Sequence, residues 1–431
     1  MWVYAMKLEI KENHFYMNQE PFFWLGDTAW LLFEKLSLTE AKRYLNNRKS
    51  LGFTVIQCVL LHTYQNGSSC AGKSPHTMEY WNEVKEVIAY ANSLKLVMGI
   101  LPFWGAMLKN NIITSDNIDR YTAFLNQFFK ENENIVWILG GDIRGDTYFK
   151  FYDAFGKKLK QANPSRLITF HPFGRTASYQ WFNACDWIDF HMFQSGHRRY
   201  DQVCMNAWDD KTLQDDVFGE DNYKYVMKNQ AIIPFKPCLD GEPSYEGIPQ
   251  GLHNPLEPYW QAKDVRRYAY WSVLEGACGF TYGNNAVMQF YRKQDKEGSY
   301  GVKEEWEEAL YMPGAQQMHH LKNLMLYIDF IHGTSRSDIV INPKPFYEHI
   351  ACFGNSHYVI CYIFLGKKFA LNLEHYSNLK GYWINPENGK IQFLGDVKTS
   401  CCIEFIPPMR KKEENDWVLL LVNENEEFSI M

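Results

Sequence analysis

Short apolar runs of strand length alternate with helical patterns from about residue 20 to residue 330. The runs are rich in β-branched and aromatic residues and end at turn residues, which is typical of strands buried on both faces. Strands that alternate with helices form parallel sheets, and eight such units close into a (β/α)8 barrel, also called a TIM barrel. The eight predicted strands are residues 22–26, 54–60, 96–101, 135–139, 167–170, 187–190, 236–239 and 276–281.

Helix signals separate these runs. Ser37 and Glu40 have the spacing of a capping box, which predicts a helix from there to Leu51, with Gly52 as its C-terminal stop. An open doubly wound sheet is the alternative to a barrel. That fold has a glycine-rich phosphate loop after its first strand, and residues 25–30 (Leu-Gly-Asp-Thr-Ala-Trp) do not form one. A closed barrel is therefore the predicted architecture.

The pattern changes after about residue 335. Helical stripes give way to alternating runs at 358–364, 368–373 and 403–406, with turn residues between them. This is typical of a small antiparallel β-sandwich. A chain of 431 residues also exceeds the roughly 250–300 residues at which a single core stops growing. We therefore predict a catalytic barrel over residues 1–334 and a C-terminal β-sandwich domain over residues 335–431.

Charge and hydropathy bear on partners and location. The net charge is −6 and no basic stripe occurs, which argues against a nucleic-acid partner. No apolar run approaches the roughly 18 residues of a membrane helix, so no membrane partner is expected. The N-terminus lacks the features of a secretory leader. The expected location is therefore the cytoplasm, or the periplasm or exterior if a leader has been lost from this sequence.

Two acidic residues follow predicted strands at positions suited to carbohydrate cleavage. In a (β/α)8 barrel, the strand exits at the C-terminal face build the active site. Asp142 follows strand four in a Gly-Gly-Asp sequence, and Glu242 follows strand seven in Asp-Gly-Glu. Glycoside hydrolysis needs two carboxyl groups that flank the scissile bond, one as acid and one as nucleophile or base. Either carboxylate alone is equally well explained as a helix cap, so the prediction depends on the pair.

Other strand exits carry polar and aromatic residues suited to sugars. Trp and Tyr offer flat apolar faces with polar tips, and aromatic residues make up 16% of the chain. Asp27 is either a sugar ligand or the cap of a helix that begins there. The histidines lack a spacing typical of metal sites, so neither a metal nor another cofactor is expected. The predicted substrate-binding residues are Asp27, Trp30, His62, Trp104, His171, Gln194, His197 and Tyr282.

Five short motifs, in order along the chain, resemble the apiosidase-like family of glycoside hydrolases. They are residues 23–30 (Phe-Trp-Leu-Gly-Asp-Thr-Ala-Trp), 140–142 (Gly-Gly-Asp), 194–197 (Gln-Ser-Gly-His), 240–243 (Asp-Gly-Glu-Pro) and 270–272 (Tyr-Trp-Ser). Residues 381–386 (Gly-Tyr-Trp-Ile-Asn-Pro) and 416–418 (Asp-Trp-Val) resemble the small collagen-binding-like β domain that often accompanies this family.

The resemblance implies a barrel of the large retaining glycosidase clan, whose acid/base follows strand four and whose nucleophile follows strand seven. Those positions here are Asp142 and Glu242. The clan usually has Asn-Glu at the first position, where this chain has Gly141 and Asp142, as apiosidase-like members do. After strand eight the chain has Gly283 and Asn284 where Gly-His is expected. The implied substrates are plant polysaccharides or oligosaccharides, with apiose-containing pectin among them.

The sequence thus predicts a retaining glycoside hydrolase with a carbohydrate substrate. The alternative is a non-catalytic carbohydrate-binding protein on a degenerate barrel, which the loss of either carboxylate would indicate. Both Asp142 and Glu242 are present. A polysaccharide lyase or a metal-dependent hydrolase on the same barrel also stays open.

Overall fold

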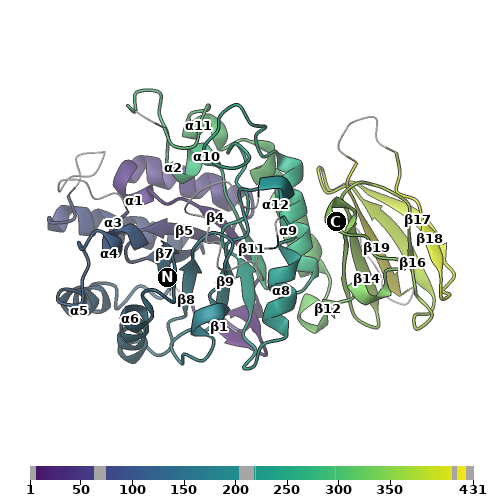
Figure 1. Cartoon of the computed structure of the whole chain (residues 1–431), viewed down its shortest axis with the longest axis horizontal. Helices are drawn as coiled ribbons and strands as arrows, with labels where there is room; N and C mark the ends of the chain where they lie inside the picture. Colours follow the sequence, from purple (N-terminus) through teal and green to yellow (C-terminus); the bar gives the residue numbers. More distant parts are fainter. Residues whose placement is uncertain are drawn as a thin grey trace.

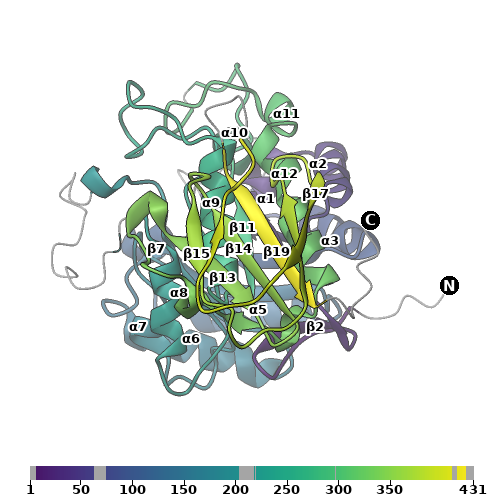
Figure 2. The same ribbon diagram turned by 90° about the vertical axis from the view of Figure 1, so that its right-hand side faces the viewer.

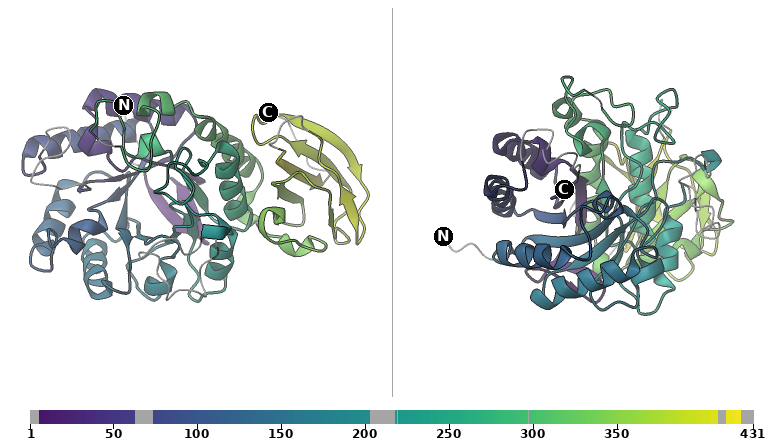
Figure 3. Two further views of the ribbon diagram at one scale, coloured as in Figure 1. Left: turned by 45° about the horizontal axis from the view of Figure 1, so that its top comes forward. Right: turned by 60° about the vertical axis from the view of Figure 1, so that its left-hand side comes forward.

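The computed structural model describes residues 6–62, 74–202, 218, 220–296, 298–409 and 415–423. A sheet of eight parallel strands lies inside a ring of helices, and a β-rich part packs beside them (Figure 1 and Figure 3). The sheet strands are β4 Trp24–Thr28, β5 Val55–Val59, β6 Val97–Leu101, β7 Ile135–Ile143, β8 Ile168–Pro172, β9 His191–Phe193, β10 Cys238–Asp240 and β11 Gly279–Tyr282.

Twelve α-helices are assigned in the described part of the chain, most of them around this sheet. None of them combines the length and the hydropathy that crossing a bilayer requires. They are α1 Leu32–Lys35, α2 Leu38–Ser50, α3 Met78–Ser93, α4 Gly105–Lys109, α5 Ile118–Phe128, α6 Phe149–Ala162, α7 Tyr179–Phe182, α8 Tyr223–Gln230, α9 Ala262–Leu274, α10 Asn285–Met288, α11 Trp306–Ala309 and α12 Pro313–Tyr327.

The strand order is β8-β7-β6-β5-β4-β11-β10-β9, and the sheet curves until its two end strands meet. The backbone N–H of Asp189 donates to the carbonyl oxygen of Ile168 at 2.9 Å. The Thr169 hydroxyl donates to the carbonyl oxygen of Phe190 at 2.6 Å. These bonds join β8 to the chain that leads into β9. The architecture is the predicted (β/α)8 barrel.

The capping box predicted at the start of α2 is present. Glu40 N–H donates to the Ser37 hydroxyl at 3.3 Å, and Ser37 N–H donates back to the Glu40 carboxylate at 2.9 Å. Leu51 caps the other end, and Gly52 follows with a φ of +85°, a conformation that glycine adopts without strain. The sequence therefore located both ends of this helix.

A hairpin that the sequence analysis did not predict precedes the barrel. It consists of β1 Leu8–Lys11, β2 His14–Met17 and β3 Glu20–Pro21. The Phe15 ring lies 5.6 Å from the ring of Trp24 and 5.0 Å from that of Phe190. Trp24 begins β4 and Phe190 precedes β9, so the hairpin covers the amino-terminal end of the barrel, away from the predicted active site.

The prediction for strand six was wrong in position. Residues 187–190 form a loop, and the strand is β9, which begins at His191. Trp187 is buried because its indole packs on Gly156 of α6 and donates to Asp153 at 3.2 Å. The apolar character of this segment therefore serves contact with a helix. His191 consequently lies within the strand, where Ser178 and Asn183 hold its ring.

The C-terminal part is formed of antiparallel sheets, as expected, and lies against α9 and α12 (Figure 1 and Figure 2). In β14, Tyr358, Ile360 and Tyr362 pack toward the barrel helices, while the alternate residues join a separate sandwich core. The strands of the C-terminal part are β12 Thr334–Ser335, β13 Ile350–Gly354, β14 Tyr358–Ile363, β15 Phe369–Leu371, β16 Leu379–Ile384, β17 Ile391–Val397, β18 Ile403–Phe405 and β19 Trp417–Asn423.

Candidate active site

Asp142 is delivered to the barrel mouth by a bulge in β7. The pairing of β7 with β8 joins Gly140 to His171 and resumes only at Ile143, so residues 141 and 142 stand out of the ladder. Gly140 and Gly141 both have φ of +94°, and Asp142 has φ of +48°. A Cβ on Gly140 would lie 2.2 Å from the carbonyl oxygen of His171. The Gly-Gly-Asp sequence is therefore what this bulge requires.

Glu242 is held by the loops that follow β9 and β10. Its carbonyl oxygen accepts from the N–H groups of Ser195 and Gly196 at 3.1 and 3.2 Å. The Ser195 hydroxyl in turn donates to the Asp240 carboxylate at 2.5 Å. These bonds lock the two loops together, and the next residue along the first loop is His197. The chain thereby brings His197 to the Glu242 side chain.

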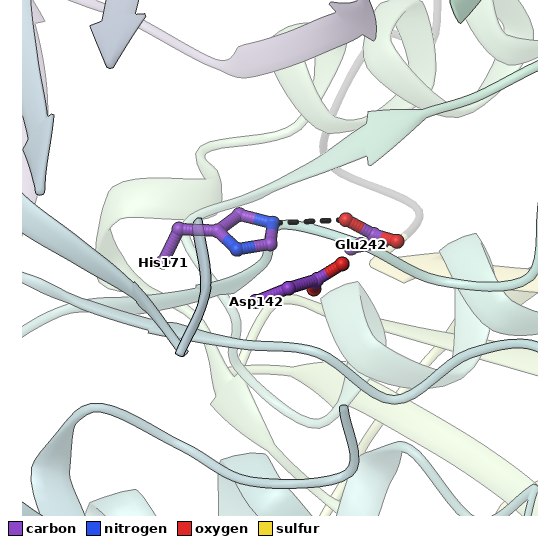
Figure 4. Close-up of side chains that lie close together, drawn as sticks. All are labelled: Asp142, His171 and Glu242. Carbon is purple, nitrogen blue, oxygen red and sulfur yellow. Dashed lines mark ion pairs between the residues drawn. The ribbon is translucent and has the colours of Figure 1, made fainter. Parts of the chain in front are cut away.

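Two histidines contact the Glu242 carboxylate, His171 from the end of β8 and His197 from the loop after β9. His171 Nε2 lies 3.0 Å from Oε2 (Figure 4). His197 Nε2 lies 3.1 Å from Oε1. One nitrogen or oxygen atom each of Asp142, His171 and Glu242 lies within 4.8 Å of the others, so the two carboxyl groups lie close together. Glu242 and His171 are buried, while Asp142 is half-buried. Asp142 is therefore the more open of the two acids.

The surroundings shift the pKa values of the two carboxyl groups in opposite directions. Burial raises the pKa of Asp142 to about 6, and the negative charge of Glu242 acts in the same direction. Burial would also raise the pKa of Glu242, but hydrogen bonds and positive charge from His171 and His197 outweigh it and lower that pKa to about 2. Burial opposes protonation of His171, yet the two carboxylates raise its pKa overall. At mildly acidic pH, Asp142 holds a proton and Glu242 does not.

Gln194 joins this group from the loop after β9. Its side chain acts on the Asp142 carboxyl group and lowers the pKa of that group, against the effect of burial. Its carbonyl oxygen accepts from Arg175 N–H at 2.7 Å, which fixes the backbone beneath it. Asp142, Glu242, His171, Gln194 and His197, all predicted from strand exits, therefore meet at one place.

An aromatic wall borders the pair. The Trp30 ring lies 5.2 Å from Trp104 and meets His171 edge-on at 5.4 Å, and Trp104 lies 4.9 Å from His62. Burial lowers the pKa of His62 to about 4, so its ring is neutral near neutral pH. Trp104 and His62 are half-buried, whereas Trp30 is only 4% exposed. Trp30 therefore supports the wall, and a free stacking face is better provided by Trp104.

Asp27 and Tyr282 do not lie open at this site. The Asp27 carboxylate is fully buried, accepts from Arg48 Nε at 2.6 Å and also accepts from the Tyr44 hydroxyl. Tyr282 is fully buried and donates to the Glu246 carboxylate at 2.6 Å. These bonds make both residues part of an interior polar network. The structure thus gives both residues interior partners, and the sugar-binding role predicted for them stays a prediction.

Two tyrosines near the pair were missed at the sequence level. The Tyr245 ring meets the His197 ring edge-on at 4.9 Å, and burial together with the charge of Glu242 raises the pKa of Tyr245. Tyr245 follows Glu242 by three residues, a proximity that was available as a signal. Burial and the charges of Asp142 and Glu242 also raise the pKa of Tyr300. Tyr300 lies far from any strand exit, so no local pattern marks it.

Asp142, His171 and Glu242 are also the one cluster of metal-type ligands found among the described residues. Their nitrogen and oxygen donors are of the kinds that divalent transition metals accept. However, His171 and Glu242 already neutralise one another at 3.0 Å. The buried negative charge of Glu242 is therefore balanced by this ion pair.

Comparison with known proteins extends this description. A family model described as "Apiosidase-like, catalytic domain" matches residues 11–332, and one described as "Putative collagen-binding domain of a collagenase" matches residues 335–422. A solved structure described as a glycoside hydrolase is 34% identical, with a TM-score of 0.89 and 98% of each chain covered. A glycoside hydrolase family 5 structure from Bacteroides vulgatus ATCC 8482 is 32% identical, with a TM-score of 0.89, covering 98% of this chain and 94% of its own. No curated protein matches the sequence.

Proposed function

This chain belongs to the apiosidase-like family of glycoside hydrolases, and from that premise we propose that Asp142 and Glu242 cleave a glycosidic bond with retention of configuration. The observation that carries the proposal is the separation of at most 4.8 Å between their nearest carboxyl oxygens. Retaining enzymes hold the two groups about 5–5.5 Å apart, and inverting enzymes need about 6.5–9.5 Å to admit a water molecule. The observed spacing agrees with the first class.

Glu242 is the nucleophile in this proposal. Its low pKa leaves it ionised, and contacts from His171 and His197 hold its two oxygens in place. One oxygen attacks the anomeric carbon and forms a covalent glycosyl–enzyme ester, while the bond to the leaving oxygen breaks. The histidines stabilise the carboxylate both before attack and when it leaves again in the second step.

Asp142 acts as the acid and then as the base. Because its pKa is raised to about 6, it carries a proton that it gives to the leaving oxygen, which departs as an alcohol. The ionised Asp142 then takes a proton from water, and the resulting hydroxide equivalent attacks the anomeric carbon and releases Glu242. The partial exposure of Asp142 suits this role, since the leaving group and the water reach the site from the open mouth.

The substrate class proposed is a plant polysaccharide or oligosaccharide, in particular apiose-containing pectin. The family description supports this choice. The half-buried faces of Trp104 and His62 beside the carboxyl pair also suit a sugar ring.

The test is incubation with plant pectin fragments, including apiose-bearing side chains, followed by proton NMR of the first sugar released. We expect the retained anomer, and no release by the Glu242→Gln variant. An inverted anomer contradicts the nucleophile role of Glu242. Activity that survives a metal chelator separates this mechanism from that of a metal-dependent hydrolase. Failure on every pectin fragment contradicts the substrate class, and a panel of 4-nitrophenyl glycosides then tests the catalytic pair by itself.

A further inference from the structure

Tyr300 lies between α10 and α11 in an uncommon backbone conformation. Its φ is +54°, and the φ of the following Gly301 is +57°. A bulky side chain is rarely found in this left-handed region, because Cβ crowds the backbone. Such conformations persist only where neighbouring contacts impose them, and they gather at functional sites.

Side chains from the adjacent helix hold the conformation in place. Asn285 Nδ2 donates to the carbonyl oxygen of Tyr300 at 2.8 Å. Gln289 Oε1 accepts from the N–H of Ser299 at 2.8 Å, and Gln289 Nε2 donates to Asn285 Oδ1 at 2.8 Å. The Tyr259 hydroxyl donates to the carbonyl oxygen of the residue after Tyr300 at 3.0 Å. The backbone of residues 299–301 is thus held by three side chains that come from outside this segment.

Tyr300 belongs to the segment that follows β11, and therefore comes from the carboxyl end of a barrel strand. It is half-buried and packs against the same apolar cluster as Trp30 and Trp104. Its ring centroid lies 5.8 Å from that of His253, which comes from the loop after β10. Tyr300 and His253 therefore bring together the segments that follow β11 and β10.

The hydroxyl of Tyr300 lies within the electrostatic influence of both catalytic carboxyl groups. Burial raises its pKa, and the charges of Asp142 and Glu242 raise it further. The phenol is therefore neutral at working pH and keeps its proton. A neutral phenol offers one donor and an acceptor, which are the groups that a sugar hydroxyl pairs with.

We propose that Tyr300 is a substrate-contacting residue whose hydroxyl hydrogen-bonds the sugar unit held between Asp142 and Glu242. The proposal rests on the proposed catalytic pair. Because Asn285 and Gln289 fix the backbone before substrate arrives, the hydroxyl is positioned in advance and little order is lost on binding.

The first test is kinetic and uses the 4-nitrophenyl glycoside that the unmodified enzyme cleaves fastest. Tyr300→Phe removes only the hydroxyl, so we expect KM to rise about 3- to 10-fold with kcat less affected. Tyr300→Ala removes the ring as well and should lower kcat/KM by about 10- to 100-fold. Tyr311→Phe is the matched control, because Tyr311, which follows α11, is 61% exposed and should behave as wild type. Kinetic constants of Tyr300→Phe equal to those of the control overturn the proposal.

The second test needs no substrate, so it stands if the proposed function fails. In protein labelled with ¹³C at tyrosine Cζ, the resonance that disappears in Tyr300→Phe identifies Tyr300. That resonance should shift with an inflection near pH 6, where Asp142 titrates, and the inflection should vanish in Asp142→Asn. A Tyr300 resonance that stays constant across that range shows that the hydroxyl does not face the pair, and overturns the proposal. If no aryl glycoside is cleaved while the inflection is present, the catalytic assignment fails and the location of Tyr300 holds.

Discussion

Arg266 in α9 and Asp416, which directly precedes β19, form a bidentate ion pair between the barrel and the C-terminal sheets. Nε lies 2.8 Å from Oδ2, Nη2 lies 2.9 Å from Oδ1, and neither side chain is more than 1% exposed. The Tyr362 hydroxyl also donates to Asp416 Oδ2 at 2.9 Å. The two charges are removed from water and depend on one another.

Removal of one member of this pair should destabilise the whole chain. In Asp416→Ala the Arg266 charge stays buried without its carboxylate, so we expect the free energy of unfolding to fall by about 3–5 kcal/mol. Urea unfolding followed by tryptophan fluorescence measures this. The control is Glu404→Ala, which breaks an ion pair on the surface. In that pair the side chain of Lys368 is 58% exposed and that of Glu404 is 60% exposed. That loss should cost less than about 1 kcal/mol. Equal effects of the two variants contradict the prediction.

The pH dependence of kcat/KM should follow the two carboxyl groups. The acid form of Asp142 is required, and its pKa is raised to about 6, so activity should fall as pH rises through that value. Glu242 must be ionised, and its lowered pKa places the acidic limb near pH 2, below the range in which the fold is readily assayed. In Asp142→Asn, residual activity on an activated aryl glycoside should lose the limb near pH 6. A limb that persists unchanged in that variant assigns it to another group.

Loss of the nucleophile should be more severe than loss of the acid. Glu242→Ala should lower kcat by roughly 10⁴-fold or more, since no other group attacks the anomeric carbon. The space left by the side chain admits a small anion, so azide should restore part of the turnover of an activated substrate. Proton NMR should then show a glycosyl azide of inverted configuration. A retained product from the azide reaction points to a different nucleophile.

His197 should affect both rate and pH dependence. Its Nε2 donates to Glu242 at 3.1 Å, and hydrogen bonds to charged groups contribute about 1.5–3 kcal/mol. His197→Gln should therefore lower kcat/KM by about 10- to 100-fold. Because one of the causes that lower the pKa of Glu242 is lost, the acidic limb should move to higher pH. His332→Gln, at a side chain that is 69% exposed, is the control and should leave the profile unchanged.

The bulge in β7 should not tolerate a side chain. Gly140→Ala places Cβ 2.2 Å from a backbone oxygen at a φ of +94°. We expect a loss of about 1–3 kcal/mol in stability and a fall in kcat, since Asp142 moves with the strand. Gly174→Ala is the matched control, because nothing lies within 4 Å of its added Cβ. A Gly140 variant with normal stability and activity contradicts the need for the bulge.

The barrel was predictable because its signals are local. Strand length, β-branched runs and the Ser37–Glu40 cap act within a few residues of one another. The error at strand six arose from a longer-range cause. Trp187 owes its burial to Gly156 on a helix 31 positions earlier, and an apolar run alone does not distinguish contact with a helix from membership of a sheet.

The candidate site residues were likewise predictable where the signal is local, and not where it depends on distant residues. Asp142 and Glu242 carry glycine-rich motifs that point to sharp turns at strand exits, so residue type and position agree. Asp27 carries a similar motif, but its role depends on Arg48 and on complete burial, neither of which a sequence pattern shows. Tyr300 depends on anchors that only the folded chain brings to it, which is why it was missed.

Helix α9 has almost no surface in water: apart from Lys263, each of its residues is buried. One side lies on β11 and the other on the sheets that follow residue 334. Neither the barrel nor the C-terminal sheets can therefore be exchanged or expressed alone without exposing apolar surface. We expect the protein to melt in one cooperative calorimetric transition, and a chain cut after α12 to aggregate because the sheets that shield α9 would be gone.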